Sequence, residues 1–292
     1  MLRFIQCLET NEKYNKEYYQ KICINSYAIT NQKYPIEVYQ PNNNNISENL
    51  IKYINKYGYF FKEILPDIDS KDYKNYFNKF IVMDFLSSKY KNDYLLWMDV
   101  DVVFLKEITE NIFQEITQNN KCKIIKIDKK DFNKEYFIDI YDKYFKKIYK
   151  IDLEYFVPSS IILANSNHFI WKETYKIMLD LVNISKNISK NIEIPYSFSF
   201  EEMALTILAN KYPNDFEDFN KNKKYICYQE KEIEPIEKYI CNNDSILYHY
   251  NTLDMFTRCC KNISKKYFFG LSKSLDIDKI IFETKINIKD LE

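Results

Sequence analysis

The first hundred residues alternate between short apolar segments typical of strands and longer amphipathic segments typical of helices. Strands are predicted at residues 2–8, 36–39, 59–65 and 94–98, and helices at 13–28, 47–56 and 73–90. This alternation favours right-handed βαβ units, which build a mostly parallel sheet with helices on both faces. The predicted fold class is therefore α/β, and open sheets of this kind bind ligands at the carboxyl ends of their strands.

The second half of the chain is less regular. Further strands are predicted at 123–127, 155–157, 161–164, 225–228 and 246–248, helices at 168–182 and 201–211, and an amphipathic stretch at 134–150. The sequence contains no internal repeat and no clear linker. We therefore expect one domain over residues 1–292.

Charge and cysteine usage exclude several functional classes. Lys and Arg total 42, as do Asp and Glu, so the chain lacks the basic excess of nucleic-acid-binding proteins. The seven cysteines form no CxxC pair, which argues against a zinc knuckle or a disulfide framework. The longest apolar run is about five residues, far below the ~20 of a transmembrane segment, and no signal peptide is recognisable. We expect a soluble, cytoplasmic protein with no nucleic-acid partner; a homo-oligomer stays open.

Glycine is almost absent from the chain, with only two residues in 292. The glycine-rich loops that usually cradle phosphate groups are therefore excluded. Any bound phosphate must be held in another way, most simply by a metal ion.

Two carboxylates, Asp99 and Asp101, stand between the apolar segments 94–98 and 102–105. In a regular strand, residues i and i+2 point to the same face. Two acids on one face in an apolar context repel each other and are costly to bury unpaired. A divalent cation resolves this conflict, because carboxylate oxygens suit Mg²⁺ or Mn²⁺. Such an ion bridges the diphosphate of a nucleotide and offsets charge on the leaving group.

The alternative interpretation of Asp99 and Asp101 is a turn at the end of a strand, with both acids solvated. A second D-x-D, formed by Asp67 and Asp69, follows Pro66 and has no apolar run after it, so it is typical of a loop. The apolar segments on both sides of Asp99 and Asp101 favour the metal interpretation.

Residues 73–108 resemble the DxD region of GT-A glycosyltransferases, in which an amphipathic helix leads to an apolar strand, the D-x-D and a hydrophobic exit. Residues 155–165 are similar to the segment that lines the donor-sugar and acceptor site in these families. Residues 199–205 resemble the acidic motif that opens the following helix and contacts sugars. Residues 246–250 lie where many such enzymes place a histidine as third metal ligand. The resemblance covers about residues 2–260.

The resemblance implies a GT-A fold, a mostly parallel sheet flanked by helices with a less regular acceptor side. It divides the chain into a nucleotide-binding half (1–105), an acceptor-binding half (106–270) and a C-terminal tail (271–292). It also implies site residues. The metal ligands would be Asp99, Asp101 and His249, the catalytic residues Glu202 and Glu201, and the contacts to the nucleotide sugar Thr10, Asn11, Tyr14, Lys79, Asp84, Asp99, Ser159 and Ser160.

The predicted contact residues fall into groups according to the part of the nucleotide sugar that each would contact. Residues 10, 11 and 14 follow the first strand, where these enzymes receive the nucleobase. Lys79 would meet a phosphate, Asp84 the donor sugar, and Ser159 and Ser160 the sugar pocket. The other histidine, His168, precedes a helix and is interpreted as a residue of its cap region, with no metal role.

Two adjacent acids, Glu201 and Glu202, fall in the first turn of a predicted helix, where negative charge favours the helix dipole. Neighbouring helical side chains point ~100° apart, so at most one of the two faces a cleft. Either acid would serve as general base in an inverting reaction, or as a ligand of the acceptor hydroxyl in a retaining one. We prefer Glu202.

The sequence departs from the GT-A pattern at two places. The family's glycine-containing segment reads Pro158-Ser159-Ser160 here, so the backbone of the sugar pocket differs. The family's glycine-lysine-proline-tryptophan continuation after the metal-binding histidine is absent. Lys261 and Arg258 are the candidates to replace its contact with the diphosphate.

These patterns predict a glycosyltransferase that uses Mn²⁺ or Mg²⁺ and a nucleotide-diphosphate sugar. UDP-sugars are favoured over GDP-sugars, and the acceptor would be a hydroxyl of a glycan, a lipid-linked sugar or a protein. One alternative is a sugar-nucleotide nucleotidyltransferase, which normally carries a glycine-rich N-terminal loop. Another is a catalytically inactive carbohydrate-binding or scaffold protein of the same fold.

Overall fold

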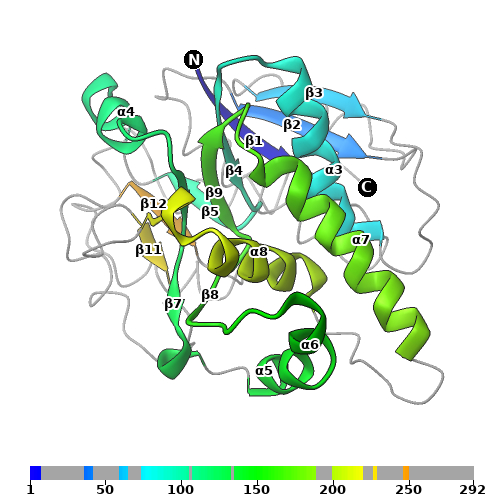
Figure 1. Ribbon diagram of the computed structural model, residues 1–292. Helices are drawn as coiled ribbons and strands as arrows, with labels where there is room; N and C mark the ends of the chain where they lie inside the picture. Colours follow the sequence, from blue (N-terminus) through cyan, green and yellow to red (C-terminus); the bar gives the residue numbers. More distant parts are fainter. Residues whose placement is uncertain are drawn as a thin grey trace, which may run out of the picture. The chain divides into compact units, whose positions relative to one another are not determined.

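The computed structural model describes residues 1–7, 36–41, 59–64, 74–104, 107–132, 135–188, 199–219, 226–228 and 246–249. The architecture is mixed α/β, with a mostly parallel central sheet flanked by helices (Figure 1). The chain divides into two compact units whose segments interleave along the sequence. The first unit comprises Met1 and residues 67–94 and 119–219, and the second comprises residues 2–66, 95–118 and 220–292.

The second unit contains four neighbouring strands of the central sheet. Their bounds are β1 (Leu2–Cys7), β2 (Ile36–Pro41), β3 (Tyr59–Ile64) and β4 (Tyr94–Met98), and their order is β4-β1-β2-β3. Strand β1 is parallel to β2, and β2 is parallel to β3. Almost every residue of β1 and β4 is buried, without alternation. Continuous burial is typical of parallel strands that are covered on both faces.

A smaller sheet in the second unit bears on the candidate site. Its strands are β5 (Val102–Phe104), β11 (Ile226–Tyr228) and β12 (Leu247–His249), in the order β11-β12-β5. Strand β12 runs parallel to β11 and antiparallel to β5. Helix α4 (Glu110–Thr117) follows β5, and the hydroxyl of Thr109 accepts a hydrogen bond from its Ile112 N–H.

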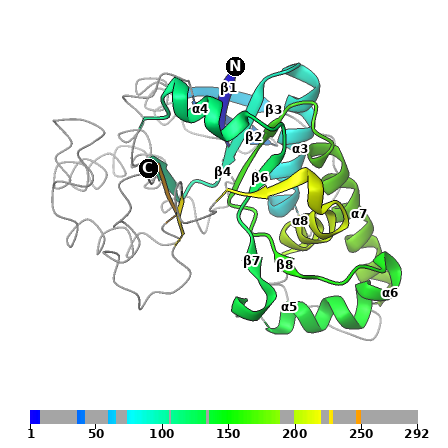
Figure 2. The ribbon, with the colours of Figure 1, turned by 60° about the vertical axis from the view of Figure 1, so that its left-hand side comes forward.

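The first unit is built largely from helices. Its long helices are α3 (Lys74–Lys89), α7 (Ile170–Ile188) and α8 (Phe200–Lys211). Helix α7 packs against both α3 and α8 (Figure 2). These helices bury apolar side chains that recur at helical spacing, among them Phe80 and Met83 of α3 and Trp171 and Met178 of α7.

The remaining elements of the first unit are short. Strands β6 (Cys122–Ile124), β9 (Ile161–Asn165) and β10 (Phe216–Asp218) pair in the order β10-β6-β9, and β7 (Ile127–Asp128) pairs with β8 (Tyr155–Phe156). A helical segment consists of α5 (Glu135–Ile140), a π-helical turn (Tyr141–Phe145) and α6 (Lys146–Tyr149), and single 3₁₀ turns occupy Lys129–Asp131 and Pro213–Asp215.

Most predicted elements that fall on described residues are confirmed, and strand β4 has the predicted bounds. The strand predicted at 123–127 is wrong in its extent, because β6 ends at Ile124 and the chain resumes pairing only in β7. At that break the N–H of Phe219 donates to the carbonyl of Ile124, and the N–H of Lys126 donates to the carboxylate of Asp218. The helices predicted at 13–28 and 47–56 lie outside the described residues.

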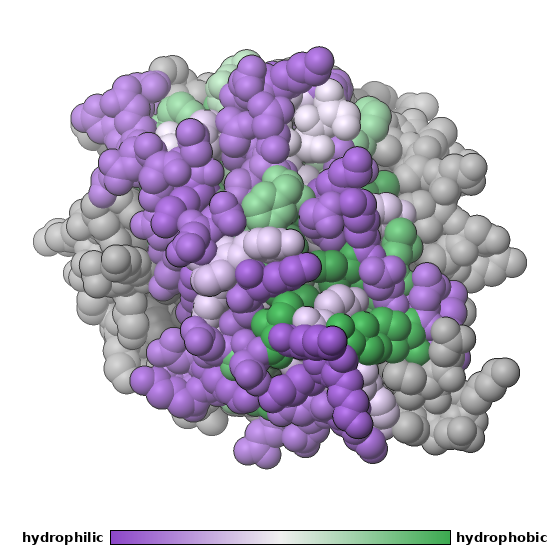
Figure 3. Space-filling model, viewed as in Figure 1, coloured by the Kyte–Doolittle hydropathy of each residue, from purple (hydrophilic) through white to green (hydrophobic). Residues whose placement is uncertain are grey.

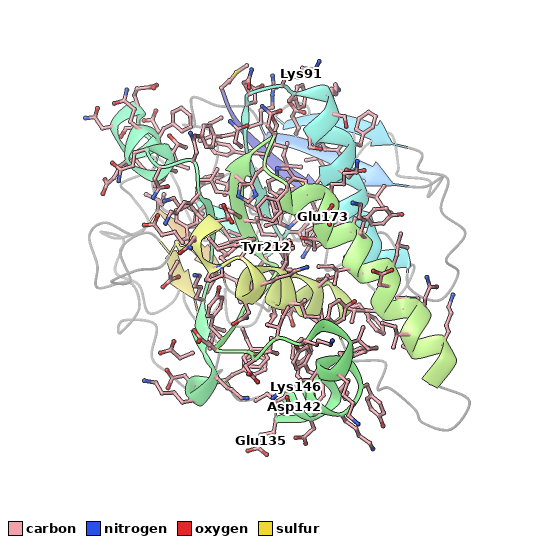
Figure 4. All side chains as sticks on the ribbon, in the orientation of Figure 1. Lys91, Glu135, Asp142, Lys146, Glu173 and Tyr212 are labelled. Carbon is pink, nitrogen blue, oxygen red and sulfur yellow. The ribbon has the colours of Figure 1, made fainter. Side chains whose placement is uncertain are left out.

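No helix among the described residues is long and apolar enough to cross a membrane. In the view of Figure 3, hydrophilic side chains cover most of the described surface, and hydrophobic ones gather in a smaller area near the middle. The α5–α6 segment carries exposed charge: Lys146 lies 3.8 Å from Asp142, which Figure 4 labels, and 2.7 Å from Asp152.

Candidate functional site

The two carboxylates of the D-x-D lie in a tight turn between β4 and β5. The N–H of Val102 donates to the carbonyl of Asp99 at 3.1 Å, which is the hydrogen bond of a β-turn. The same-face argument for Asp99 and Asp101 assumed a regular strand and is therefore wrong for this backbone. The alternative interpretation as a turn is right about the backbone. It is wrong about solvation, because Asp99 is half-buried and only 17% of the Asp101 side chain is exposed.

Strand pairing brings His249 to this turn. In the antiparallel pair of β12 and β5, His249 lies directly opposite Val102, the residue that follows Asp101. Its Nε2 lies 3.3 Å from Oδ1 of Asp101, and the imidazole is buried. Two of the three predicted metal ligands, separated by almost 150 residues in the sequence, thus meet inside the second unit.

The third predicted ligand, Asp99, is held by two buried residues. The indole Nε1 of Trp97 donates to its carboxylate Oδ1 at 2.9 Å. The side-chain amide Nε2 of Gln6 donates to its backbone carbonyl at 3.3 Å. Sequence reasoning missed both residues. The sequence offered two signals: a tryptophan lies two positions before the acid at the end of a strand, and Gln6 is the one uncharged polar side chain in a first strand that otherwise contains apolar residues and Arg3.

The donor atoms at the turn suit a divalent cation, since carboxylate oxygens bind Mg²⁺ and Mn²⁺ and an imidazole nitrogen binds transition metals. Asp101 and His249 are already within one hydrogen-bond length of each other and are shielded from water. However, no cluster of three or more His, Cys, Asp or Glu side chains among the described residues is arranged to hold a metal. One oxygen of the Asp99 carboxylate, Oδ1, accepts the hydrogen bond from the Trp97 indole. The residue types therefore fit a metal, and two of the three predicted ligands lie close together.

A second polar cluster lies in the first unit and joins three of the predicted site residues. Lys79 of α3 donates through Nζ to the carbonyl and to Oγ of Ser159, at 3.1 and 2.8 Å, and lies 3.4 Å from Oε1 of Glu201. The hydroxyl of Ser159 donates to the same Oε1 at 2.8 Å. Only 4% of Lys79 and 8% of Glu201 is exposed. Charged groups this deeply buried require such partners.

Local structure fixes each member of the Lys79–Ser159–Glu201 cluster. Ser159 follows Pro158 in the connection between β8 and β9. Glu201 lies in the first turn of α8, whose N-cap is Ser199: the Ser199 hydroxyl accepts from the N–H of Glu202. Lys79 is the one buried polar residue among residues 79–89 of α3, the part of this helix whose burial the structure describes. Three segments far apart in the sequence therefore meet at one buried ion pair.

Of the remaining predicted site residues, the structure describes Ser160, Glu202 and Asp84. Ser160 is buried, and its Oγ has no hydrogen-bond partner among the residues that the structure describes. Glu202 is half-buried beside the buried Glu201. Asp84 is half-buried on α3, and burial together with the charge of Asp84 raises the pKa of Tyr175 on α7. Thr10, Asn11 and Tyr14 lie outside the described residues.

The remaining histidine, His168, belongs to the cap of α7, as predicted. Its Nδ1 accepts a hydrogen bond from the N–H of Ile170 at 3.2 Å. The ring stacks on Phe169 and meets the edge of Phe216. Burial lowers the pKa of His168, against the opposing influence of Asp215. A neutral imidazole is therefore part of the folded cap.

Comparisons with known proteins place the chain by fold. No protein-family model matches the sequence, and no curated protein matches it significantly. Mouse xyloside xylosyltransferase 1 matches with a TM-score of 0.51 and 12% identity, over 86% of this chain and 98% of that one. The galactosyltransferase LgtC matches with a TM-score of 0.48 and 11% identity, over 91% of this chain and 99% of that one. The fold assignment rests on the xylosyltransferase, and the predicted GT-A fold class is confirmed.

Proposed function

We propose that this chain is a metal-dependent glycosyltransferase that transfers a sugar from a nucleotide-diphosphate sugar, preferably a UDP-sugar, to a hydroxyl acceptor on a glycan, a lipid-linked sugar or a protein. The observation that carries the proposal is the meeting of Asp101 with His249 at a buried turn, in a chain of GT-A fold. A carboxylate and an imidazole from separate strands, both shielded from water, are a donor set for a cation.

We assign the metal to Asp101, His249 and Asp99. The bound Mn²⁺ or Mg²⁺ would supply Lewis-acid stabilisation of the leaving diphosphate. Both Asp101 and His249 are largely buried, so few water molecules would compete with a cation for their side of the turn. The nucleobase is assigned to Thr10, Asn11 and Tyr14, which follow β1 in the sequence.

We assign the sugar chemistry to the first turn of α8. The ammonium of Lys79 and the hydroxyl of Ser159 already contact Oε1 of Glu201, so this carboxylate fixes the cluster in place. Glu202, which is half-buried in the same turn, is the better candidate to accept a proton from the acceptor hydroxyl or to bind that hydroxyl. Ser160 and Asp84 are assigned to the sugar. The single-domain organisation, the cytoplasmic location and the oligomeric state stay predictions.

Hydrolysis of nucleotide sugars without an acceptor tests the proposal. The wild type should release UDP from at least one UDP-sugar in the presence of Mn²⁺. Asp101→Asn should lose this activity, whereas Asp139→Asn, which changes an exposed acid on α5, should keep it. Formation of UTP and a sugar 1-phosphate from a UDP-sugar and added pyrophosphate would instead indicate a nucleotidyltransferase. No turnover of any UDP- or GDP-sugar, with carbohydrate binding retained, would indicate the inactive alternative.

A further inference from the structure

The Asp99 carboxylate is oriented by a tryptophan from the strand that leads into the turn. Trp97 is 1% exposed, and its indole Nε1 lies 2.9 Å from Oδ1 of Asp99. An indole N–H can only donate a hydrogen bond, so Oδ1 of Asp99 is the acceptor in this contact. It also restricts rotation of that carboxylate, because the donor is fixed in the core of the second unit.

The backbone of the same residue is held by a glutamine from the neighbouring strand β1. Gln6 is 1% exposed, and its Nε2 lies 3.3 Å from the carbonyl oxygen of Asp99. That oxygen also accepts the turn hydrogen bond from Val102. A carbonyl can only accept, so the amide must present its NH₂ group here, which leaves Oε1 pointing elsewhere. This Oε1 is buried with no hydrogen-bond partner among the described residues.

We propose that Trp97 and Gln6 are positioning residues that fix the carboxylate and the backbone of Asp99 for a divalent cation. The inference rests on the proposed function. Side chains that hydrogen-bond a metal-binding carboxylate set its orientation, and their removal typically costs 10–100-fold in metal affinity. A glutamine buried with one unsatisfied oxygen is costly to the fold. The hydrogen bond that its amide donates to the carbonyl of Asp99 explains why a glutamine occupies this position.

A purely structural role makes a different prediction. A buried indole that only fills space would lower the free energy of unfolding when it is replaced, and cation affinity of the folded protein would not change. The chain offers a matched control for this distinction, because its second tryptophan, Trp171, is also fully buried. The Nε1 of Trp171 donates to the carbonyl of Asn165 at 3.0 Å, inside the first unit.

The test compares Trp97→Phe with Trp171→Phe by titration with Mn²⁺ in the presence of UDP, following free Mn²⁺ by electron paramagnetic resonance. Circular dichroism first establishes that both variants are folded. We expect Trp97→Phe to bind Mn²⁺ about 10–100-fold more weakly than the wild type, and Trp171→Phe to match the wild type. Gln6→Met, which keeps the length of the side chain but removes its amide, should also weaken binding. Wild-type affinity in both Trp97→Phe and Gln6→Met would overturn the inference.

A fluorescence experiment tests the inference in a protein whose turn residues are unchanged. Trp171→Phe leaves Trp97 as the only indole of the chain, and paramagnetic Mn²⁺ bound at Asp99 should quench its fluorescence. Mg²⁺ should quench far less, and Asp101→Asn should abolish the effect of Mn²⁺. If Mn²⁺ bound without quenching the fluorescence, the ion would lie away from Trp97. This result would overturn the inference but not the proposed function. Absence of Mn²⁺ binding in the wild type would overturn the proposed function as well.

Discussion

Replacement of Lys79 by methionine should strongly destabilise the protein, because it leaves the Glu201 carboxylate buried without its cation. Nζ of Lys79 lies 3.4 Å from Oε1 of Glu201, and Ser159 bridges the two with contacts of 2.8 Å on either side. Both charged residues are more than nine-tenths buried. Removing one partner of such a pair costs about 3–5 kcal/mol, since the remaining charge keeps its full desolvation penalty.

A double-mutant cycle by urea denaturation measures this effect. The free energies of unfolding of Lys79→Met, Glu201→Gln and the double variant are compared with that of the wild type. The double variant should lose less than the sum of the two single losses, because it contains no buried unpaired charge. Lys146→Met is the control: its ion pair with Asp152 is exposed, so its loss should have no measurable effect.

Two results would refute this reasoning. If Lys79→Met lost less than about 1 kcal/mol, the ion pair would behave as an exposed one. If the two single losses added fully in the double variant, Lys79 and Glu201 would not interact in the folded protein.

Two further predictions concern helix caps. Because burial lowers the pKa of His168, its contribution to stability is fully present above the unfolded value of about 6.5 and is lost as the pH falls below it. His168→Asn keeps an acceptor for the N–H of Ile170, so unfolding measured between pH 8 and pH 5 should show a weaker pH dependence; an unchanged profile would contradict this assignment. Ser199→Ala should cost about 1 kcal/mol by removing the cap of α8, and Ser199→Asp should restore most of it; equal stability of Ser199→Ala and the wild type would contradict the cap.

The sequence predicted the parallel strands of the second unit because their signal is local. Strand β4 is an apolar run that ends at the D-x-D, and β1, β2 and β3 are short, mostly apolar segments. Helices α7 and α8 were predicted for a similar reason, since their apolar residues recur at helical spacing. Helix α4 and strand β10 were not predicted. They are short, so too few residues fall on one face to reveal a period.

The candidate site could be predicted only in part, because its contacts join distant segments. Residue types and order singled out Asp101, His249, Lys79 and Glu201, and the structure shows which of them meet. Asp101 and His249 form one polar cluster in the second unit, and Lys79 and Glu201 belong to another in the first unit. The turn at Asp99 was only the alternative interpretation of the sequence, since an argument from period-two alternation cannot detect the hydrogen bond from Val102 to Asp99.

The support of Asp99 by tertiary contacts could not be predicted. Gln6 is one of two polar residues in β1, and its position in the sequence gives no indication of its partner. The partner depends on which strand pairs with β1. Sequence periodicity specifies the face of a side chain but not the neighbour of a strand.

Isothermal titration calorimetry of UDP, with and without Mn²⁺, on the wild type and on Asp101→Asn tests the metal-dependent donor site most directly. We predict that UDP binds the wild type only when Mn²⁺ is present, and that Asp101→Asn loses this binding at every Mn²⁺ concentration tested. UDP binding that is unaffected by the metal and by the substitution would contradict a metal held by Asp101 and His249.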